Sequence, residues 1–99
     1  MFEWDPLKAA GNLVKHGVSF EEATTVFADE HAVDVIDERH SGVERRFLKI
    51  GQSNVAAVLV IAYTLRRTGD GDEETIRIIS ARRANRKERA TYVALDQAD

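Results

Sequence analysis

The sequence contains no cysteine, a single proline and a single tryptophan in 99 residues. Without cysteine the chain has no disulfide, no thiolate metal site and no thiol nucleophile. Its longest apolar run, residues 55–63, is too short to span a membrane as a helix. The acidic start at residues 1–5 lacks the basic and then apolar order of a secretion signal. We therefore expect one cytoplasmic domain over residues 1–99, with no membrane association.

Charge is distributed unevenly along the chain, whose formal net charge is −3. Residues 1–44 hold ten acidic and three basic side chains, whereas residues 45–99 hold seven acidic and eleven basic ones. A negative net charge argues against a nucleic-acid-binding protein. A basic region, however, can hold RNA while an acidic region repels it. Because charged runs usually just solvate a surface, charge alone does not assign a function.

Two helices are expected at the N-terminus. Asp5 and Pro6 form a start signal, and Gly17 is suited to end the first helix in the left-handed conformation. The second helix starts at Ser19, whose spacing to Glu22 is that of a capping box, and closes near residue 29. Helical spacing places one set of apolar residues on a single face of the first helix: Leu7, Ala10 and Val14. The stripe of the second helix comprises Phe20, Ala23 and Phe27.

The middle of the chain is predicted to form four strands, at 32–37, 46–51, 55–65 and 75–81. A polar turn at 38–44, a short turn at 52–54 and an acidic loop at 68–74 connect them. A last helix is expected from about Lys87 to Leu95, with Asn85 and Glu88 at capping-box spacing. The order ααββββα predicts an α+β fold, in which two N-terminal helices and a C-terminal helix pack on a four-stranded antiparallel sheet.

No metal site and no cofactor are predicted. The three histidines, His16, His31 and His40, lie in three different segments without ligand spacing. The Asp-Gly-Asp run at 70–72 lacks the terminal glutamate of a calcium loop and favours a hairpin loop. Phosphate-binding glycine loops and Gly-x-Ser-x-Gly elbows are also absent from the sequence.

Basic residues recur on and after the predicted strands. Because neighbouring strands of a meander lie side by side, we expect their guanidinium groups to converge. RNA cleavage by its own 2′-hydroxyl needs a base, in-line geometry and cations on the phosphate, and arginine binds phosphate oxygens through two parallel hydrogen bonds. Arginines that only keep a wet sheet face soluble are the alternative. The residues expected to converge are Arg46, Lys49, Arg66, Arg67, Arg77, Arg82 and Arg83.

Several segments, in order along nearly the whole chain, resemble the BrnT family of toxins. The N-terminal ones are Phe-Glu-Trp-Asp at 2–5, Lys8, Asn-Leu-Val-Lys-His-Gly-Val-Ser-Phe-Glu-Glu-Ala at 12–23 and Val-Phe-Ala-Asp at 26–29. The central one is Glu-Arg-Arg-Phe-Leu-Lys-Ile-Gly at 44–51. The C-terminal one is Ile-Arg-Ile-Ile-Ser-Ala-Arg-Arg-Ala at 76–84, followed by Glu88, Arg89 and Tyr92.

The resemblance implies a fold related to the RelE toxins and a metal-independent ribonuclease that arrests translation. It also implies a BrnA-type antitoxin with a ribbon-helix-helix DNA-binding end, through which the pair binds its own promoter. Two alternatives stay open: a module that has lost catalysis and only modulates the antitoxin's repression, and an RNA-binding protein outside toxin biology. The acidic loop at 69–74 is longer than the usual turn of the family and is expected to alter RNA access.

With this resemblance, Arg77 and Arg82 are the first candidates for binding phosphate and stabilising transition-state charge. The second candidates are Glu44 and Arg46, as a base or an orienting pair, and the alternative for them is a simple surface ion pair. His16 is a candidate general acid or base, or it only favours the helix C-terminus by its charge. RNA contacts are assigned to Lys15, Lys49, Tyr63, Arg66, Arg67 and Arg83. Burial in the central strand is the alternative for Tyr63.

Overall fold

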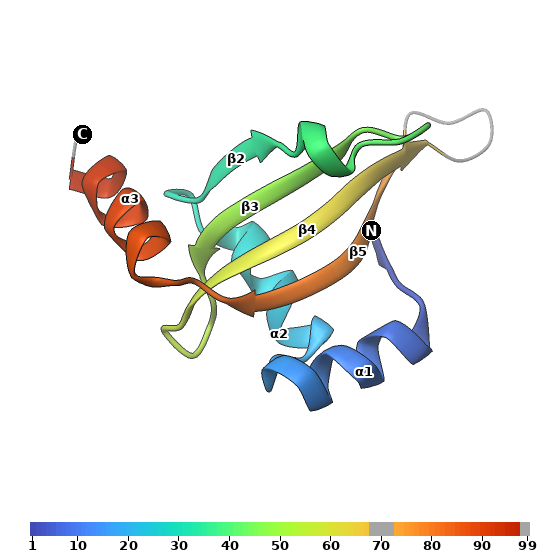
Figure 1. Cartoon of the computed structure of the whole chain (residues 1–99), viewed down its shortest axis with the longest axis horizontal. Coiled ribbons are helices and arrows are strands. Elements are labelled where there is room, and N and C mark those ends of the chain that lie inside the picture. Colours follow the sequence, from blue (N-terminus) through green and yellow to red (C-terminus); the bar gives the residue numbers. More distant parts are fainter. Residues whose placement is uncertain (68–72, 98–99) are drawn as a thin grey trace.

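A single sheet organises the chain in the computed structural model, which describes residues 1–67 and 73–97 (Figure 1). Within these residues, five strands follow the spatial order β1-β5-β4-β3-β2. Residues 68–72, most of the predicted acidic loop, lie outside the described residues. The elements are β1 (Phe2–Glu3), α1 (Pro6–His16), α2 (Phe20–Thr25), the 3₁₀ turn η1 (Val26–Ala28), β2 (Val33–Ile36), the 3₁₀ turn η2 (Glu38–His40), β3 (Arg46–Gln52), β4 (Val58–Arg67), β5 (Glu74–Arg83) and α3 (Arg86–Gln97).

The prediction of four antiparallel strands is wrong in one respect, because β1 adds a fifth strand parallel to β5. Phe2 lies opposite Ile76 and Glu3 lies opposite Arg77, and the Ile76 N–H donates to the carbonyl of residue 1 at 2.8 Å. Two residues are too few to show the alternation that marks a strand in a sequence. The other three pairings, β2–β3, β3–β4 and β4–β5, are antiparallel as predicted.

The predicted helix signals are confirmed. Asp5 Oδ1 accepts from the Leu7 N–H at 2.8 Å, and Gly17 ends α1 with a φ of 68°. Ser19 Oγ accepts from the Glu22 N–H at 3.0 Å. At α3, Asn85 and Glu88 each accept a hydrogen bond from the other's backbone N–H, which completes a capping box. Side chains thus satisfy helix N–H groups that have no partner within the helix.

The apolar face predicted for α1 exists, but it faces solvent. Leu7 is 83% exposed and Val14 is 90% exposed. The buried side chain is Asn12, whose amide donates to the Ala81 carbonyl at 2.7 Å and accepts from the Ala81 N–H at 3.1 Å. Asn12 therefore takes the place of a neighbouring strand along the part of β5 that β1 is too short to cover.

The hydrophobic core lies between α2, η1 and one face of β4 and β5. It joins buried residues of the N-terminal half, such as Phe20 and Val26, to strand residues such as Ile61 and Ile78. Trp4 and Phe27 pack against this cluster. Gly51 on β3 allows Val26 of η1 and Ala32 to pack directly against the backbone of the strand. A Cβ at this position would lie only 2.8 Å from both Val26 Cγ1 and Ala32 Cβ.

The sheet face turned away from this core is called the open face below. Cross-strand partners share a face of a sheet. Arg46, Thr64 and Arg77 form one row across β3, β4 and β5, and Val60 pairs with Arg82 four residues along β4. A bulge at Ile79 shifts the alternation, so Arg77 and Arg82 both reach the open face although their spacing is odd. The sequence pattern alone places Arg77 and Ile79 on one face and does not reveal the bulge.

Candidate functional site

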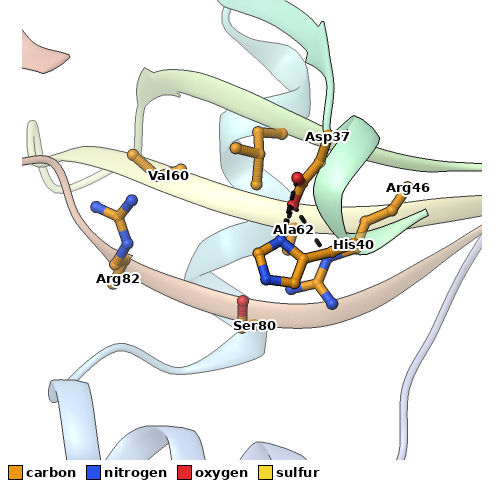
Figure 2. A pocket seen from close by; sticks show the side chains of 8 residues that line it. Asp37, His40, Arg46, Val60, Ala62, Ser80 and Arg82 are labelled. Carbon is orange, nitrogen blue, oxygen red and sulfur yellow. Dashed lines mark hydrogen bonds and ion pairs between the residues drawn. The ribbon is translucent and has the colours of Figure 1, made fainter.

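A cavity of about 200 Å³ lies on the open face beneath the turn η2 (Figure 2). Three adjacent strands supply its floor, and two side chains of the turn between β2 and β3 overhang it. Even spacing along each strand brings these side chains to the same face. The lining residues are Asp37, His40, Arg46, Leu48, Val60, Ala62, Ser80 and Arg82.

Asp37 holds the ring of His40 over the cavity. The His40 Nδ1 atom lies 2.9 Å from Asp37 Oδ2 and 3.1 Å from Oδ1. The Asp37 side chain is 12% exposed and the His40 side chain is 62% exposed. Because the carboxylate engages Nδ1, the Nε2 atom is left to face the cavity, as Figure 2 shows. This arrangement fixes the ring orientation, as expected for a group that transfers protons.

Arg46 is the cation next to this pair. Its Nε atom is buried and has no hydrogen bond within the described residues, and it lies 3.6 Å from Asp37 Oδ2. Ser41 ties the turn to β3, because its Oγ donates to the Asp37 carbonyl at 2.7 Å and accepts from the Arg46 N–H at 3.1 Å. Asp37 supplies a charged partner for the buried Nε–H, and the Arg46 side chain is 26% exposed, so its other guanidinium N–H donors can reach a phosphate oxygen.

Carboxylate side chains already form hydrogen bonds with Arg77 and Arg82, the first candidates for binding phosphate. Arg82 makes two hydrogen bonds to Glu88, at 2.7 and 2.8 Å. These bonds raise the pKa of Arg82, and the same guanidinium lowers the pKa of Glu88. Arg77 donates to Glu3 Oε2 at 2.7 Å and so links β5 to β1. Arg82 lines the cavity, whereas Arg77 lies farther along the open face, two strands from Arg46.

The expected convergence of all the strand arginines is not found. Arg66 pairs with Glu44 at 3.2 Å, so the predicted Glu44–Arg46 pair does not form. Arg66 and Arg67 lie at one end of the β4–β5 hairpin, and Arg82 and Arg83 lie at the other. Arg83 lies opposite Leu59, which is seven residues from Arg66 along β4. At strand geometry, seven residues span about 23 Å, so Arg66 and Arg83 are far apart.

Lys49 and Tyr63 lie on the core side of the sheet, opposite the cavity. The Lys49 Nζ atom is 2.8 Å from Asp34 Oδ2 and 4.9 Å from the centre of the Phe27 ring. The Tyr63 hydroxyl donates to Asp34 Oδ1 at 2.5 Å, and burial, followed by this hydrogen bond, raises the pKa of Tyr63. Tyr63 is buried, and Phe47 stacks on it. These contacts stabilise the fold, and RNA binding by Lys49 and Tyr63 stays a prediction.

Lys15 and His16 form the last turn of α1, just before Gly17, and neither lines the cavity. Their basic side chains suit a helix C-terminus, where the backbone carbonyls carry partial negative charge. The roles predicted for them in catalysis and RNA binding stay predictions.

Sequence reasoning missed Asp37, His40 and Ser80 as members of the site. The available signal was the Asp-x-x-His spacing in the polar turn directly before the strand of Arg46. Among residues 1–67 and 73–97, no three His, Cys, Asp or Glu side chains are placed to hold a metal ion. No helix in the described part of the chain is long and apolar enough to cross a membrane.

The fold and the cavity define a small α+β protein with a cationic site on the open face of its sheet. Residues 4–88 match the family model described as the ribonuclease toxin BrnT of type II toxin–antitoxin systems. The chain therefore belongs to the BrnT family of ribonuclease toxins. A crystal structure of the ribonuclease toxin BrnT from Brucella abortus has a similar fold, with a TM-score of 0.60 and 21% sequence identity. The similarity covers 87% of this chain and 99% of that one. No curated protein sequence matches the chain.

Proposed function

We propose that this chain is a metal-independent endoribonuclease that cuts RNA on the open face of its sheet and thereby arrests translation in the cytoplasm. A single observation carries the proposal: the buried Arg46 Nε atom without a hydrogen bond lies beside the Asp37–His40 pair in one cavity. A general base and a cation for phosphate are the groups that cleavage by the 2′-hydroxyl requires.

The proposed reaction uses His40 as the base and Arg46 as the phosphate-binding cation. Neutral His40 takes the proton of the 2′-hydroxyl at Nε2, and the 2′-oxygen forms a bond to phosphorus. The bond from phosphorus to the 5′-oxygen breaks, that oxygen takes a proton from water, and the hydroxide left behind removes the proton from the His40 imidazolium. Arg46 binds the non-bridging oxygens as their charge develops, and Asp37 stabilises the imidazolium that forms. The products are a 2′,3′-cyclic phosphate and a 5′-hydroxyl.

Arg82 and Arg77 extend the cationic surface beyond Arg46. Glu88 and Glu3 hold their guanidinium groups in place, and the remaining N–H donors can bind further phosphates of the RNA. Glu44 and His16 remain alternative proton-transfer groups from the sequence. The positions of His40 and Asp37 at the cavity favour these two residues instead.

An antitoxin of the BrnA type, with a ribbon-helix-helix domain, is the proposed partner. An acidic or apolar segment of this antitoxin would become ordered on the open face and block access of RNA to the cavity.

Operator DNA would bind only through the antitoxin, because the chain carries a net charge of −3 and its basic side chains lie mainly in residues 45–99. A gel shift that shows specific operator binding by the isolated chain, but not by the complex, would contradict this assignment.

Incubation of the purified chain with RNA in excess EDTA tests the proposed activity. We expect cleavage to persist and the products to carry 2′,3′-cyclic phosphates. Activity that is lost in EDTA and restored by Mg²⁺ would overturn the mechanism.

The second candidate is a catalytically inactive module that only modulates repression by the antitoxin. The carboxylates that already bind Arg77 and Arg82 favour it. Induced expression without the antitoxin separates the two candidates. Growth arrest with RNA cleavage supports the ribonuclease, and normal growth with a folded, soluble chain supports the module.

A further inference from the structure

The outward side of α1 carries an apolar stripe that nothing in the described chain covers. Its members recur at i, i+3, i+4 and i+7, so they form one line along the helix. Leu7 and Val14, at its two ends, are 83% and 90% exposed. A Cβ at Gly11, in the middle, would meet no atom within 4 Å. The α1 stripe comprises Leu7, Ala10, Gly11 and Val14.

This stripe is not a by-product of folding. Asn12 bonds α1 to β5 and Ala9 packs against the core cluster, and neither residue belongs to the stripe. An exposed Leu and an exposed Val at the two ends of one stripe cost solubility without stabilising the domain. A second protein surface that covers the stripe accounts for this pattern.

Two lysines define one edge of the α1 stripe. Lys8 and Lys15 each follow a stripe residue by one position and are seven residues apart, so both project along the same edge. Both are exposed, and no ion pair forms to either of them within the described residues. The helix α1 contains no acidic residue at all.

The charge pattern indicates which partner fits. In an antiparallel pair of two copies of α1, the lysine edges would face each other and repel. An amphipathic helix with an apolar stripe and acidic residues two turns apart along one edge would bury Leu7 and Val14 and pair with both lysines.

We propose that the α1 stripe is the docking surface for such an acid-edged amphipathic helix, supplied by the antitoxin. The choice of the antitoxin as its source rests on the proposed function. The stripe lies outside the open-face cavity, so one antitoxin helix anchors on α1 while another segment covers the RNA site. Docking and inhibition are therefore separable.

The test is calorimetric titration of the 99-residue chain with its proposed BrnA-type antitoxin. Val14→Glu places a charge in the α1 stripe and is expected to weaken binding at least tenfold. The matched control is Val55→Glu, which changes another exposed valine, in the β3–β4 turn, and should bind like the wild type. The Lys8→Glu/Lys15→Glu variant should weaken binding at low salt, and less at high salt. Melting temperatures establish that each variant is folded.

Wild-type affinity of a folded Val14→Glu variant would overturn the proposal. A wild-type dimer that Val14→Glu dissociates, without any effect on antitoxin binding, would assign the stripe to a second copy and also overturn it. RNA cleavage by the free chain is measured in parallel, because Val14 lies outside the cavity and Val14→Glu should cleave like the wild type. If the wild type binds the antitoxin through the α1 stripe but cleaves no RNA, the docking surface stands and the proposed ribonuclease activity fails.

Discussion

The two faces of the sheet use the same kinds of side chain in different ways. Arg46 and Lys49 are both basic and both lie on β3, but their spacing of three residues places them on opposite faces. On the core side, Asp34 accepts hydrogen bonds from Lys49 and Tyr63, and both of these side chains pack against Phe27. On the open face, Arg46 keeps a buried Nε atom without a hydrogen bond beside His40. The basic residue on the core side therefore contributes to stability, whereas the one on the open face lines the cavity of the proposed site.

The largest expected effect distinguishes the two candidate histidines. Loss of a positioned acid–base group typically lowers a rate by roughly 10²–10⁴-fold, so we expect this loss in kcat for His40→Ala. His16→Ala should leave kcat unchanged, because His16 ends α1 and does not line the cavity. RNA cleavage assays on both variants, with melting curves as a folding control, provide the measurement. The opposite result would return the catalytic role to His16.

The second prediction compares the two basic residues of β3. Arg46→Ala should lower kcat by roughly 10²–10³-fold, the typical cost of removing one transition-state donor, in a chain that stays folded although Asp37 loses its 3.6 Å ion pair. Lys49→Ala should retain wild-type cleavage and lose about 1 kcal/mol of unfolding free energy, because it removes the partner of Asp34 on the core side. Equal losses of activity in both variants would show that the faces do not differ in function.

A third prediction concerns packing on the core side alone. Gly51→Ala forces a Cβ to within 2.8 Å of Val26 and Ala32 and should cost about 1–3 kcal/mol of unfolding free energy. Gly11→Ala on the exposed side of α1 meets no atom within 4 Å and should stabilise the chain by up to about 1 kcal/mol. Urea unfolding of both variants measures the difference. A neutral Gly51→Ala substitution would show that η1 and β3 separate easily.

The smallest expected effect is the acid sensitivity of the contact between α3 and η1. Burial disfavours the charged form of Asp29, but hydrogen bonds from the Gln52 N–H, the Tyr92 hydroxyl and the His31 N–H prevail and lower its pKa below the usual 3.8. A lowered pKa means that Asp29 contributes its full stabilisation above pH 3.8, and that this contribution is lost as the pH falls through the folded-state value.

The matching variant is Asp29→Asn, studied by urea unfolding at neutral pH and at successive pH values below 3.8. The wild type should be more stable at neutral pH, and this advantage should shrink as the solution is acidified. An advantage that stays constant or grows on acidification would contradict the assigned direction of the pKa shift.

Local signals in the sequence predicted where the helices begin, because they act within a few residues, but α2 ends at Thr25 and a 3₁₀ turn follows, whereas the predicted helix closes near residue 29. The caps at Asp5, Ser19 and Asn85 all form as predicted. The features that were missed depend on distant partners. The two residues of β1 become a strand only beside β5, and the bulge at Ile79 shows only in the pairing with β4. The exposed stripe of α1 was also unpredictable, because a buried Asn12 sets the orientation of the helix.

The site was predictable in part, for the same reason. The sequence predicts Arg46 and Arg82 as site residues, and both line the cavity. Lys49 could have been separated from Arg46 by the parity of their spacing. His40 required the folded turn, because only η2 brings its ring over Ser80 and next to Arg46. Composition cannot separate Arg66 and Arg67 from the arginines of the site, because only the pairing of β4 with β5 places them at the other end of the hairpin from Arg82.

The most direct test of the account locates RNA on the protein. An uncleavable 2′-O-methyl RNA oligonucleotide is titrated into the isotope-labelled chain, and NMR chemical shifts are followed for backbone amides and arginine Nε–H groups. The account predicts the largest changes at His40, Arg46, Ser80 and Arg82, with α1 and the Lys49–Asp34–Tyr63 cluster unchanged. Changes confined to α1 or to that cluster, with Arg46 unaffected, would contradict an RNA site on the open face.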